Sequence, residues 1–152
     1  MPKYYKKKYY RGSKDKYSVE QTLVNGTVGS ATTSYVTVVP PVDFQGMRKV
    51  KHLTVTISPQ SSATAGFVWA LFYLPAGMTP PGFTTAAGSP LVEPNQYVMN
   101  AGIFSSGSGP IRVSSPVSRN LNSGDQVILM LRATQGADTA YTALVRYAIT
   151  LQ

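Results

Sequence analysis

Cysteine is absent from this sequence of 152 residues, and histidine and acidic residues are scarce. Without cysteine the chain forms neither disulfide bonds nor thiolate metal sites. Its only histidine is His52 and it has six acidic residues, so the ligands of a zinc site or of a calcium loop are missing. We therefore expect the protein to hold no metal ion and to use no cofactor.

The residues and motifs of catalysis are equally rare. A Ser-His-Asp arrangement would depend on His52 alone, and no nucleophile-elbow sequence is present. Paired carboxylates would require two of the six acids, of which Glu93, Asp125 and Asp138 fall in expected loops or beside turns. No glycine-rich phosphate loop of either common form occurs. We predict that the protein is not an enzyme and has no catalytic residue.

Long hydrophobic runs are also missing. The longest apolar run, Gly66 to Met78, has thirteen residues and contains Pro75, which makes it too short to span a bilayer. The first residues are basic, but no apolar segment follows them. We therefore expect neither a secretory signal nor a membrane partner.

Positive charge, in contrast, is abundant and unevenly distributed. The net charge is +8, and residues 1–16 hold seven of the fourteen Lys and Arg residues but only one of the six acids. Five of the ten tyrosines lie within residues 1–17, and the composition then changes abruptly to a chain rich in Val, Thr and Ser. We therefore divide the chain into a basic arm, residues 1–17, and a body, residues 18–152.

The arm has the composition of a segment that binds nucleic acid. Lysine neutralises phosphates, and a tyrosine ring stacks on the unpaired bases that single strands offer. Repulsion among the cations predicts that the arm is disordered until it meets an anion. The alternatives are a solubilising tail or a localisation signal, and the lysine cluster at 6–8 also suits nuclear import. The predicted nucleic-acid-binding residues of the arm are Lys3, Tyr4, Tyr5, Lys6, Lys7, Lys8, Tyr9, Tyr10, Arg11, Lys14 and Lys16.

The body has the pattern of an all-β protein. No segment has convincing helical periodicity, and runs of β-branched and aromatic residues are separated by Gly and Pro at short intervals. Residues 53–57 alternate apolar and polar, as in a half-buried strand, whereas residues 67–74 are apolar on both faces, as in a central strand of a sandwich. The eight strand candidates are residues 19–28, 33–39, 47–57, 66–74, 96–104, 111–119, 125–133 and 141–151.

Two segments interrupt this pattern. Asn25-Gly26 lies between Leu23-Val24 and Thr27-Val28, and it suits a type I′ turn that would split the first strand candidate. Residues 75–96 contain five prolines and three glycines and have no periodicity, so they are interpreted as a long surface loop that makes contacts.

A second group of cations opens the third strand candidate. In the run Arg48-Lys49-Val50-Lys51, alternation puts Lys49 and Lys51 on one face and Arg48 on the other. One interpretation is a rim that faces phosphates, and the other is a charged strand end that prevents edge pairing. The remaining arginines, Arg112, Arg119, Arg132 and Arg146, are scattered singly on strand candidates and are interpreted as surface or interface residues.

A short basic arm followed by about eight strands is similar to the capsid proteins of small circular single-stranded DNA viruses that encode a replication-initiator protein. The run Met47-Arg48-Lys49-Val50-Lys51, followed by the alternating strand, resembles the Ile-Arg-Lys-Val-Lys type of strand in circovirus capsids and a similar stretch in nanovirus capsids. The ending also resembles that family, because residues 126–131, a polar turn and residues 143–151 look like its last two strands.

This resemblance implies a single eight-stranded antiparallel jelly roll of two four-stranded sheets, with strands conventionally lettered B to I. It implies a shell of sixty copies of this protein, with arms turned inward on packaged single-stranded DNA. Residues 47–57 would be strand D, and its interior-facing basic start would be Arg48, Lys49 and Lys51. The partners would be copies of the same chain and the DNA, and the location would be the virion, with the host nucleus visited during assembly. The sequence identifies no receptor on the host cell.

The chain departs from circovirus capsids because it is much shorter and its arm is rich in Lys and Tyr instead of Arg. Satellite-type RNA viruses also use small jelly rolls with basic arms, so a coat protein of that type, which would bind RNA, is an alternative. Another is a non-specific single-stranded nucleic-acid-binding protein, which would require stacking aromatics in the body such as Trp69, Phe72 and Tyr73. In the capsid interpretation, the 75–96 loop and the 104–110 turn are the expected contacts between subunits or with the exterior.

Overall fold

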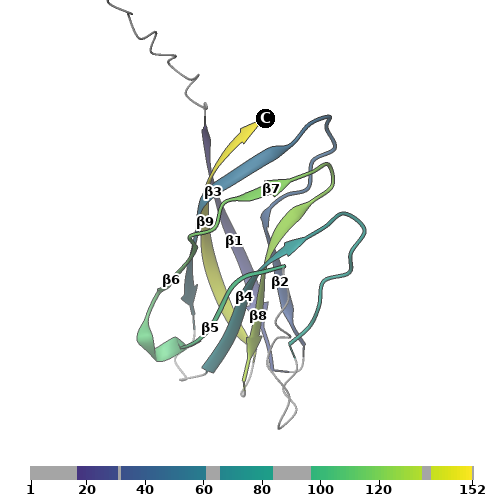
Figure 1. The fold of residues 1–152 in the computed structure, drawn as a ribbon. Coiled ribbons are helices and arrows are strands. Elements are labelled where there is room, and N and C mark those ends of the chain that lie inside the picture. Colours follow the sequence, from purple (N-terminus) through teal and green to yellow (C-terminus); the bar gives the residue numbers. More distant parts are fainter. Residues whose placement is uncertain (1–16, 31, 61–65, 84–96, 135–137, 152) are drawn as a thin grey trace, which may run out of the picture.

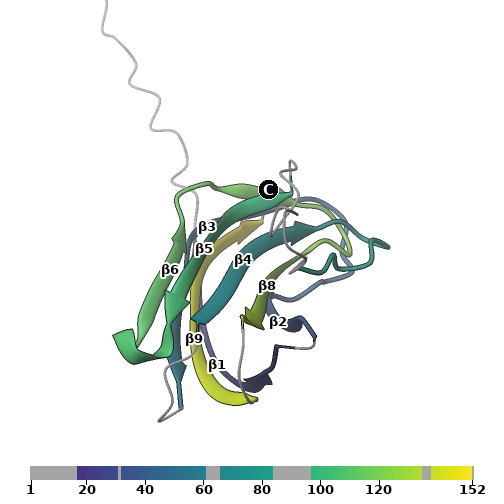
Figure 2. The same ribbon diagram turned by 90° about the horizontal axis from the view of Figure 1, so that it is seen from below.

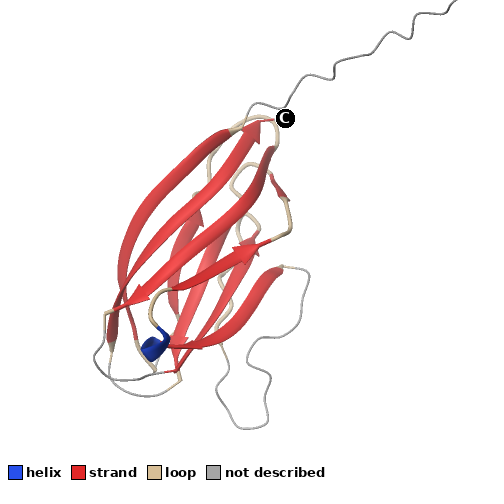
Figure 3. Ribbon diagram, turned by 90° about the vertical axis from the view of Figure 1, so that its left-hand side faces the viewer, coloured by secondary structure: helices blue, strands red, loops and turns tan. Residues whose placement is uncertain are grey.

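The computed structural model describes residues 17–30, 32–60, 66–83, 97–134 and 138–151. These residues form nine strands and a single-turn 3-10 helix (Figures 1 and 3). Within the part of the chain that is described, no helix is long and apolar enough to cross a membrane. The strands are β1 (Ser18–Val28), β2 (Ser34–Val39), β3 (Arg48–Pro59), β4 (Gly66–Leu74), β5 (Val98–Ser105), β6 (Ile111–Ser115), β7 (Arg119–Leu121), β8 (Gln126–Ala133) and β9 (Thr139–Leu151), and the helix is η1 (Ser106–Ser108).

The strands form two antiparallel sheets that pack face to face (Figure 2). Sheet 1 has the order β1-β9-β3-β6, with β7 paired to the beginning of β3, and sheet 2 has the order β2-β8-β4-β5. The chain crosses from one sheet to the other at most connections, which is the topology of a jelly roll. With β6 and β7 counted as one strand and the letters B to I given in chain order, the sheets are B-I-D-G and C-H-E-F. Strand β3 is then strand D, as the resemblance implies.

The predicted fold class is confirmed, but the prediction of eight strands in two four-stranded sheets was wrong by one strand. The candidate at 111–119 forms two short strands, β6 and β7, and sheet 1 therefore has five strands. Pro116 explains the division, because proline has no backbone N–H to donate to a ladder. Next to it, the backbone N–H of Val117 turns to the Oγ of Ser115 (3.3 Å) instead of to a neighbouring strand.

The predicted turn at Asn25-Gly26 was also wrong. Strand β1 runs unbroken through both residues, and Gly26 pairs with Tyr141 of β9. A Cβ atom at Gly26 would lie 2.5 Å from the Oη of Tyr141, so the glycine leaves room for this buried ring. The continuous pairing of the whole of β1 with β9 outweighs the local turn preference, because tertiary packing decides between competing local signals.

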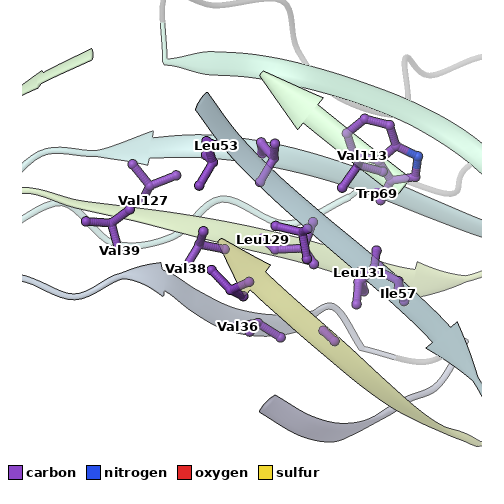
Figure 4. Packing of buried hydrophobic residues seen from close by; sticks show 14 of the residues in the cluster. Val36, Val38, Val39, Leu53, Ile57, Trp69, Val113, Val127, Leu129 and Leu131 are labelled. Atoms are coloured by element: carbon purple, nitrogen blue, oxygen red, sulfur yellow. The ribbon is translucent and has the colours of Figure 1, made fainter. Parts of the chain in front are cut away.

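The core lies between the two sheets, where alternate residues of each strand meet (Figure 4). In β3, Leu53, Val55 and Ile57 are almost completely buried, as the alternation predicts. Each such side chain contributes about 1.5–3 kcal/mol through removal of apolar surface from water. Trp69 of β4 packs in the same cluster.

Strand β4 is buried on both faces, as predicted for a central strand. Its outward-facing residues, including Val68 and Phe72, form a second apolar cluster that is covered by Phe83. Hydrogen bonds hold the segment that provides this cover: the Oη of Tyr35 donates to the carbonyl of Pro81 (3.0 Å), and Arg132 donates to the carbonyl of Phe83 (2.8 Å). The described beginning of the predicted 75–96 loop therefore packs on its own sheet, whereas residues 84–96 lie outside the described residues.

Candidate nucleic-acid interface

Five basic side chains gather on the outer face of sheet 1, the face turned away from the core. We call them the cationic face: Lys49, Lys51, His52, Arg112 and Arg146. Strand register brings them together, because β3 lies between β9 and β6. Arg146 of β9 pairs with Thr54 of β3, and Arg112 of β6 pairs with Thr56. The two arginines therefore flank β3 on the same face.

A β-bulge in β3 adds His52 to this face. Lys51 pairs with Ala148 and Thr54 pairs with Arg146, so residues 52 and 53 together oppose the single residue Tyr147. Among the described residues, His52 is the only residue other than glycine with a positive φ, which is 54°. The extra residue keeps both Val50 and Leu53 directed to the core, while Lys51 and His52 follow one another on the outer face.

No acidic residue of the described ranges balances this charge on the same face. Glu20 pairs with Tyr147 of β9, so both side chains lie on the core-facing side of sheet 1, opposite to the cationic face. Asp43 and Asp138 lie outside the strands, and Asp125 is only 4% exposed. With respect to the described side chains, the cationic face therefore presents an uncompensated positive charge, which attracts polyanions.

The arm joins the body beside this face. Strand β1 begins at Ser18, which pairs with Ile149 near the end of β9, and the Nζ of Lys51 lies 4.7 Å from the centre of the Tyr17 ring. The predicted contacts of the arm, Lys3 to Lys16, lie outside the described residues. The starting point of the arm and the cationic face thus belong to the same side of the sandwich.

Arg48 differs from the two lysines that follow it. It is only 5% exposed, and its Nη2 donates hydrogen bonds to the carbonyls of Pro40 (3.0 Å) and Asp125 (3.2 Å). Burial lowers its pKa, an effect that the charges of Tyr147 and Asp125 oppose. Its guanidinium also lies 5.5 Å from the centre of the Phe44 ring. Arg48 therefore offers almost no surface to a ligand, whereas Lys49 and Lys51 lie on the outer face as the alternation predicts.

Arg112 and Arg146 were missed as candidate ligands in the sequence, where each was interpreted as an isolated surface or interface residue. The signal that would have found them is the register of β3 with its two neighbours, and local periodicity does not contain it. A further cation, Arg119, lies at the beginning of β7 with its guanidinium 4.5 Å from the centre of the Tyr73 ring. It pairs with Val50 of β3 and so belongs to the core-facing side of sheet 1, and it lines an open hollow with Lys49 and Asn120.

The aromatic residues required for a stacking surface in the body are buried. Trp69, Phe72 and Tyr73 are 7%, 0% and 9% exposed, respectively, and all three pack in the apolar clusters. They are therefore not available to stack on bases, which weakens the alternative of a single-stranded nucleic-acid-binding module.

Two titratable groups with shifted pKa values, Asp125 and Tyr73, form a buried polar network away from the cationic face. Asp125 accepts hydrogen bonds from the Oη of Tyr73 (2.5 Å) and from the backbone N–H groups of Asn122 (2.8 Å) and Ala76 (3.0 Å). Burial would raise the pKa of Asp125, but these hydrogen bonds together hold it below its usual value. Burial and the hydrogen bond to Asp125 raise the pKa of Tyr73 to about 12. The network therefore links the end of β4 and the turn that follows it to the turn between β7 and β8.

No cluster of metal ligands accompanies these groups, since no three His, Cys, Asp or Glu residues gather within the described ranges. Taken together, the fold and the charge define the class of protein: an all-β jelly-roll sandwich whose first sheet carries a cationic face next to the origin of a basic arm.

Comparisons of this chain with known proteins give no sequence match and a weak structural similarity. No family model matches it, and no curated protein sequence matches it. Among solved structures it is similar to a chain in the structure of the infectious bursal disease virus Gx strain, with 8% sequence identity and a TM-score of 0.23. The match covers 91% of this chain and 41% of that chain, so this chain spans about two fifths of the length of its match.

Proposed function

We propose that the protein is a viral capsid protein that assembles into a closed icosahedral shell of sixty copies and encloses single-stranded DNA. In this proposal the sandwich builds the wall, while the arm and the cationic face hold the DNA through charge. The protein acts in the virion and has no catalytic role. The cluster Lys6–Lys8 directs it to the host nucleus during assembly.

The observation that supports this proposal most directly is the position of the arm's origin beside the cationic face. Lys51 contacts Tyr17, the first described residue after the arm's charged segment. The outer face of sheet 2 has a different character, because its arginine, Arg132, donates hydrogen bonds to the carbonyls of Ser30 and Phe83. A wall that carries these cations and the origin of the arm on one side has one surface suited to a polyanion, and in a shell that surface would be the interior.

Contacts between copies would cover the apolar residues that the edges of the sheets expose. Leu23 of β1 is 61% exposed, and Ile103 of β5 is 64% exposed. Edge strands also present unpaired backbone groups, which a neighbouring copy can pair or cover. The 104–110 turn, which contains η1, remains a proposed contact between subunits or with the exterior.

The charge of such a shell suits a small genome. Sixty copies at +8 carry about 480 positive charges, roughly 360 of which come from residues 1–16. These charges neutralise a few hundred phosphates, so a longer genome would require additional cations or polyamines inside the shell.

The test is the size and content of the purified protein. We expect particles of megadalton size whose nucleic acid survives nuclease treatment of the intact particle, and after extraction this nucleic acid should be digested by DNase. Digestion by RNase instead would favour the satellite-type alternative. A protein that stays monomeric at all salt concentrations and pH values would refute the capsid proposal.

Deletion of residues 2–16 separates the two parts of the proposal. We expect the truncated protein to fold, because no described strand includes these residues, but to lose or randomise its packaged nucleic acid. A matched control replaces the four tyrosines at 4, 5, 9 and 10 by serine, which keeps every charge and should therefore keep the amount packaged. Unchanged packaging after the deletion would show that the arm does not hold the cargo.

A further inference from the structure

The cationic face contains a hollow of about 240 Å³ at the place where β1, β3, β6 and β9 lie side by side. Polar side chains of His52, Thr54, Arg112 and Arg146 line it, and Val19 and Ala148 contribute an apolar wall. The sequence alone gave no reason to group these residues, which come from four strands.

Three structural features together direct basic groups into this hollow. The bulge turns His52 outward next to Thr54, and strand pairing sets Arg146 opposite Thr54 and Arg112 opposite Thr56. No ion pair within the described part of the chain involves either arginine. Neighbouring like charges repel, and an anion bound between them would relieve this repulsion.

The chemistry of the lining suits a phosphate group. The planar guanidinium of arginine offers several N–H donors in a fork that matches phosphate oxygens, and a threonine hydroxyl and an imidazole add further donors. The apolar wall of Val19 and Ala148 gives the sugar next to such a phosphate a surface to pack against. A backbone phosphate with its sugar therefore satisfies both kinds of lining.

We infer that this hollow binds one backbone phosphate of a single-stranded nucleic acid, with Arg112 and Arg146 as its main ligands. The inference rests on the proposed function and deepens it: the arm supplies non-specific charge, and the hollow supplies a fixed position for the strand. In a symmetric shell the hollow recurs once in every copy, so the strand would be held at regularly repeated points.

The experiment measures the binding of fluorescein-labelled ten-nucleotide dT and U strands to the full-length protein at nanomolar concentration, where subunits stay apart. Single-strand affinity falls with salt, with a slope of about −0.7 for each neutralised phosphate. We expect Arg146→Gln and Arg112→Gln each to weaken binding about tenfold and to reduce the magnitude of the slope by about 0.7. If the Arg→Gln variants lose the same affinity for the dT and U strands, the hollow binds the phosphate alone. If they lose affinity for the dT strand only, the hollow also recognises the DNA sugar.

Two further variants guard against indirect effects. Thr37→Glu changes an exposed residue of β2 in sheet 2 and lowers the net charge by one, as Arg146→Gln does, so it should change affinity at most about twofold. Arg146→Lys keeps the charge but loses the fork, so it should retain the slope while binding more weakly. Circular dichroism spectra confirm that each variant is folded.

The outcomes separate this inference from the proposed function. If both Arg→Gln variants bind like wild type while deletion of residues 2–16 abolishes binding, the inference fails and the packaging role of the arm stands. If Thr37→Glu weakens binding as much as Arg146→Gln, the effect is only net charge, and the hollow is not a site. If the unaltered protein binds neither strand, the proposed packaging role fails as well.

Discussion

Replacement of Asp125 by alanine should remove a large share of the stability of the sandwich. The carboxylate accepts hydrogen bonds from Tyr73, Ala76 and Asn122, and the variant leaves all three donors without this acceptor. A buried donor without a partner costs about 1–3 kcal/mol. Because the hydrogen bonds from Ala76 and Asn122 to Asp125 are only partly buried, water can partly replace them. We therefore expect the free energy of unfolding to fall by about 3–5 kcal/mol at pH 7, from the 5–15 kcal/mol typical of a domain.

The effect of this variant should depend on pH in a defined direction. The hydrogen bonds hold the native pKa of Asp125 below its usual value, which is about 3.9 in an unfolded chain. The stability that the carboxylate contributes is therefore complete above about pH 4 and is lost as the pH falls through the native pKa. The difference in unfolding free energy between wild type and Asp125→Ala should shrink over that range and stay constant from pH 5 to 8.

Tyr73, the partner of Asp125, should show the opposite dependence. Its native pKa is raised to about 12, so the neutral hydroxyl contributes stability that is complete below about pH 10 and is lost between pH 10 and 12. The Tyr73→Phe variant lacks this group, so its unfolding free energy should converge with that of wild type over the same range. At pH 7 the variant also leaves one acceptor site of Asp125 unused.

Urea unfolding of unassembled subunits measures these quantities, and the fluorescence of Trp69, the only tryptophan, reports on the core. A suitable control is Asp43→Ala, which removes another carboxylate that accepts one hydrogen bond, from Ser123, at the surface and should cost less than about 0.5 kcal/mol. A loss below about 1 kcal/mol for Asp125→Ala, or a loss that stays the same from pH 7 to pH 2, would refute the reasoning about this network.

Two further predictions concern backbone positions. Gly26→Ala should lower stability by about 1–3 kcal/mol, because its Cβ would press on the buried Tyr141, whereas Gly82→Ala has ordinary contacts and should be neutral in thermal unfolding. Equal melting temperatures for the two variants would contradict this. His52→Val should lose about 1–3 kcal/mol because a β-branched residue rarely adopts positive φ, whereas His52→Asn should be tolerated. If both variants unfold in urea like wild type, the bulge conformation is not under strain.

Much of the fold could be predicted because each strand carries its own periodicity. Residues 53–57 bury alternate side chains and residues 67–74 bury both faces, and both patterns are visible in a short window of sequence. Seven of the eight strand candidates correspond to single strands. The exception is the candidate at 111–119, where Pro116 already indicates a break because proline cannot donate a hydrogen bond to a neighbouring strand.

The interface was less predictable because it depends on which strands become neighbours. Arg112 and Arg146 are far apart in the sequence, and only their separate pairing with β3 brings them to one face. The burial of Arg48 was partly foreseeable, since alternation directs it away from Lys49 and Lys51. The guanidinium of Arg48 donates to the carbonyls of Pro40 and Asp125. Both carbonyls lie in loops, and no local sequence pattern predicts how these loops pack around Arg48.

The bulge at His52 connects the requirements of the core with the charge of the outer face. Two residues separate Val50 from Leu53, so a regular strand would turn one of these apolar side chains to solvent. One extra residue in β3 resolves this conflict through a positive φ at His52, and it also sends Lys51 and His52 to the same face. An unbroken alternation would instead direct His52 into the apolar core, where a polar group requires a hydrogen-bond partner. The hollow therefore forms at the one point of β3 where both requirements meet, between the arginines of the two neighbouring strands.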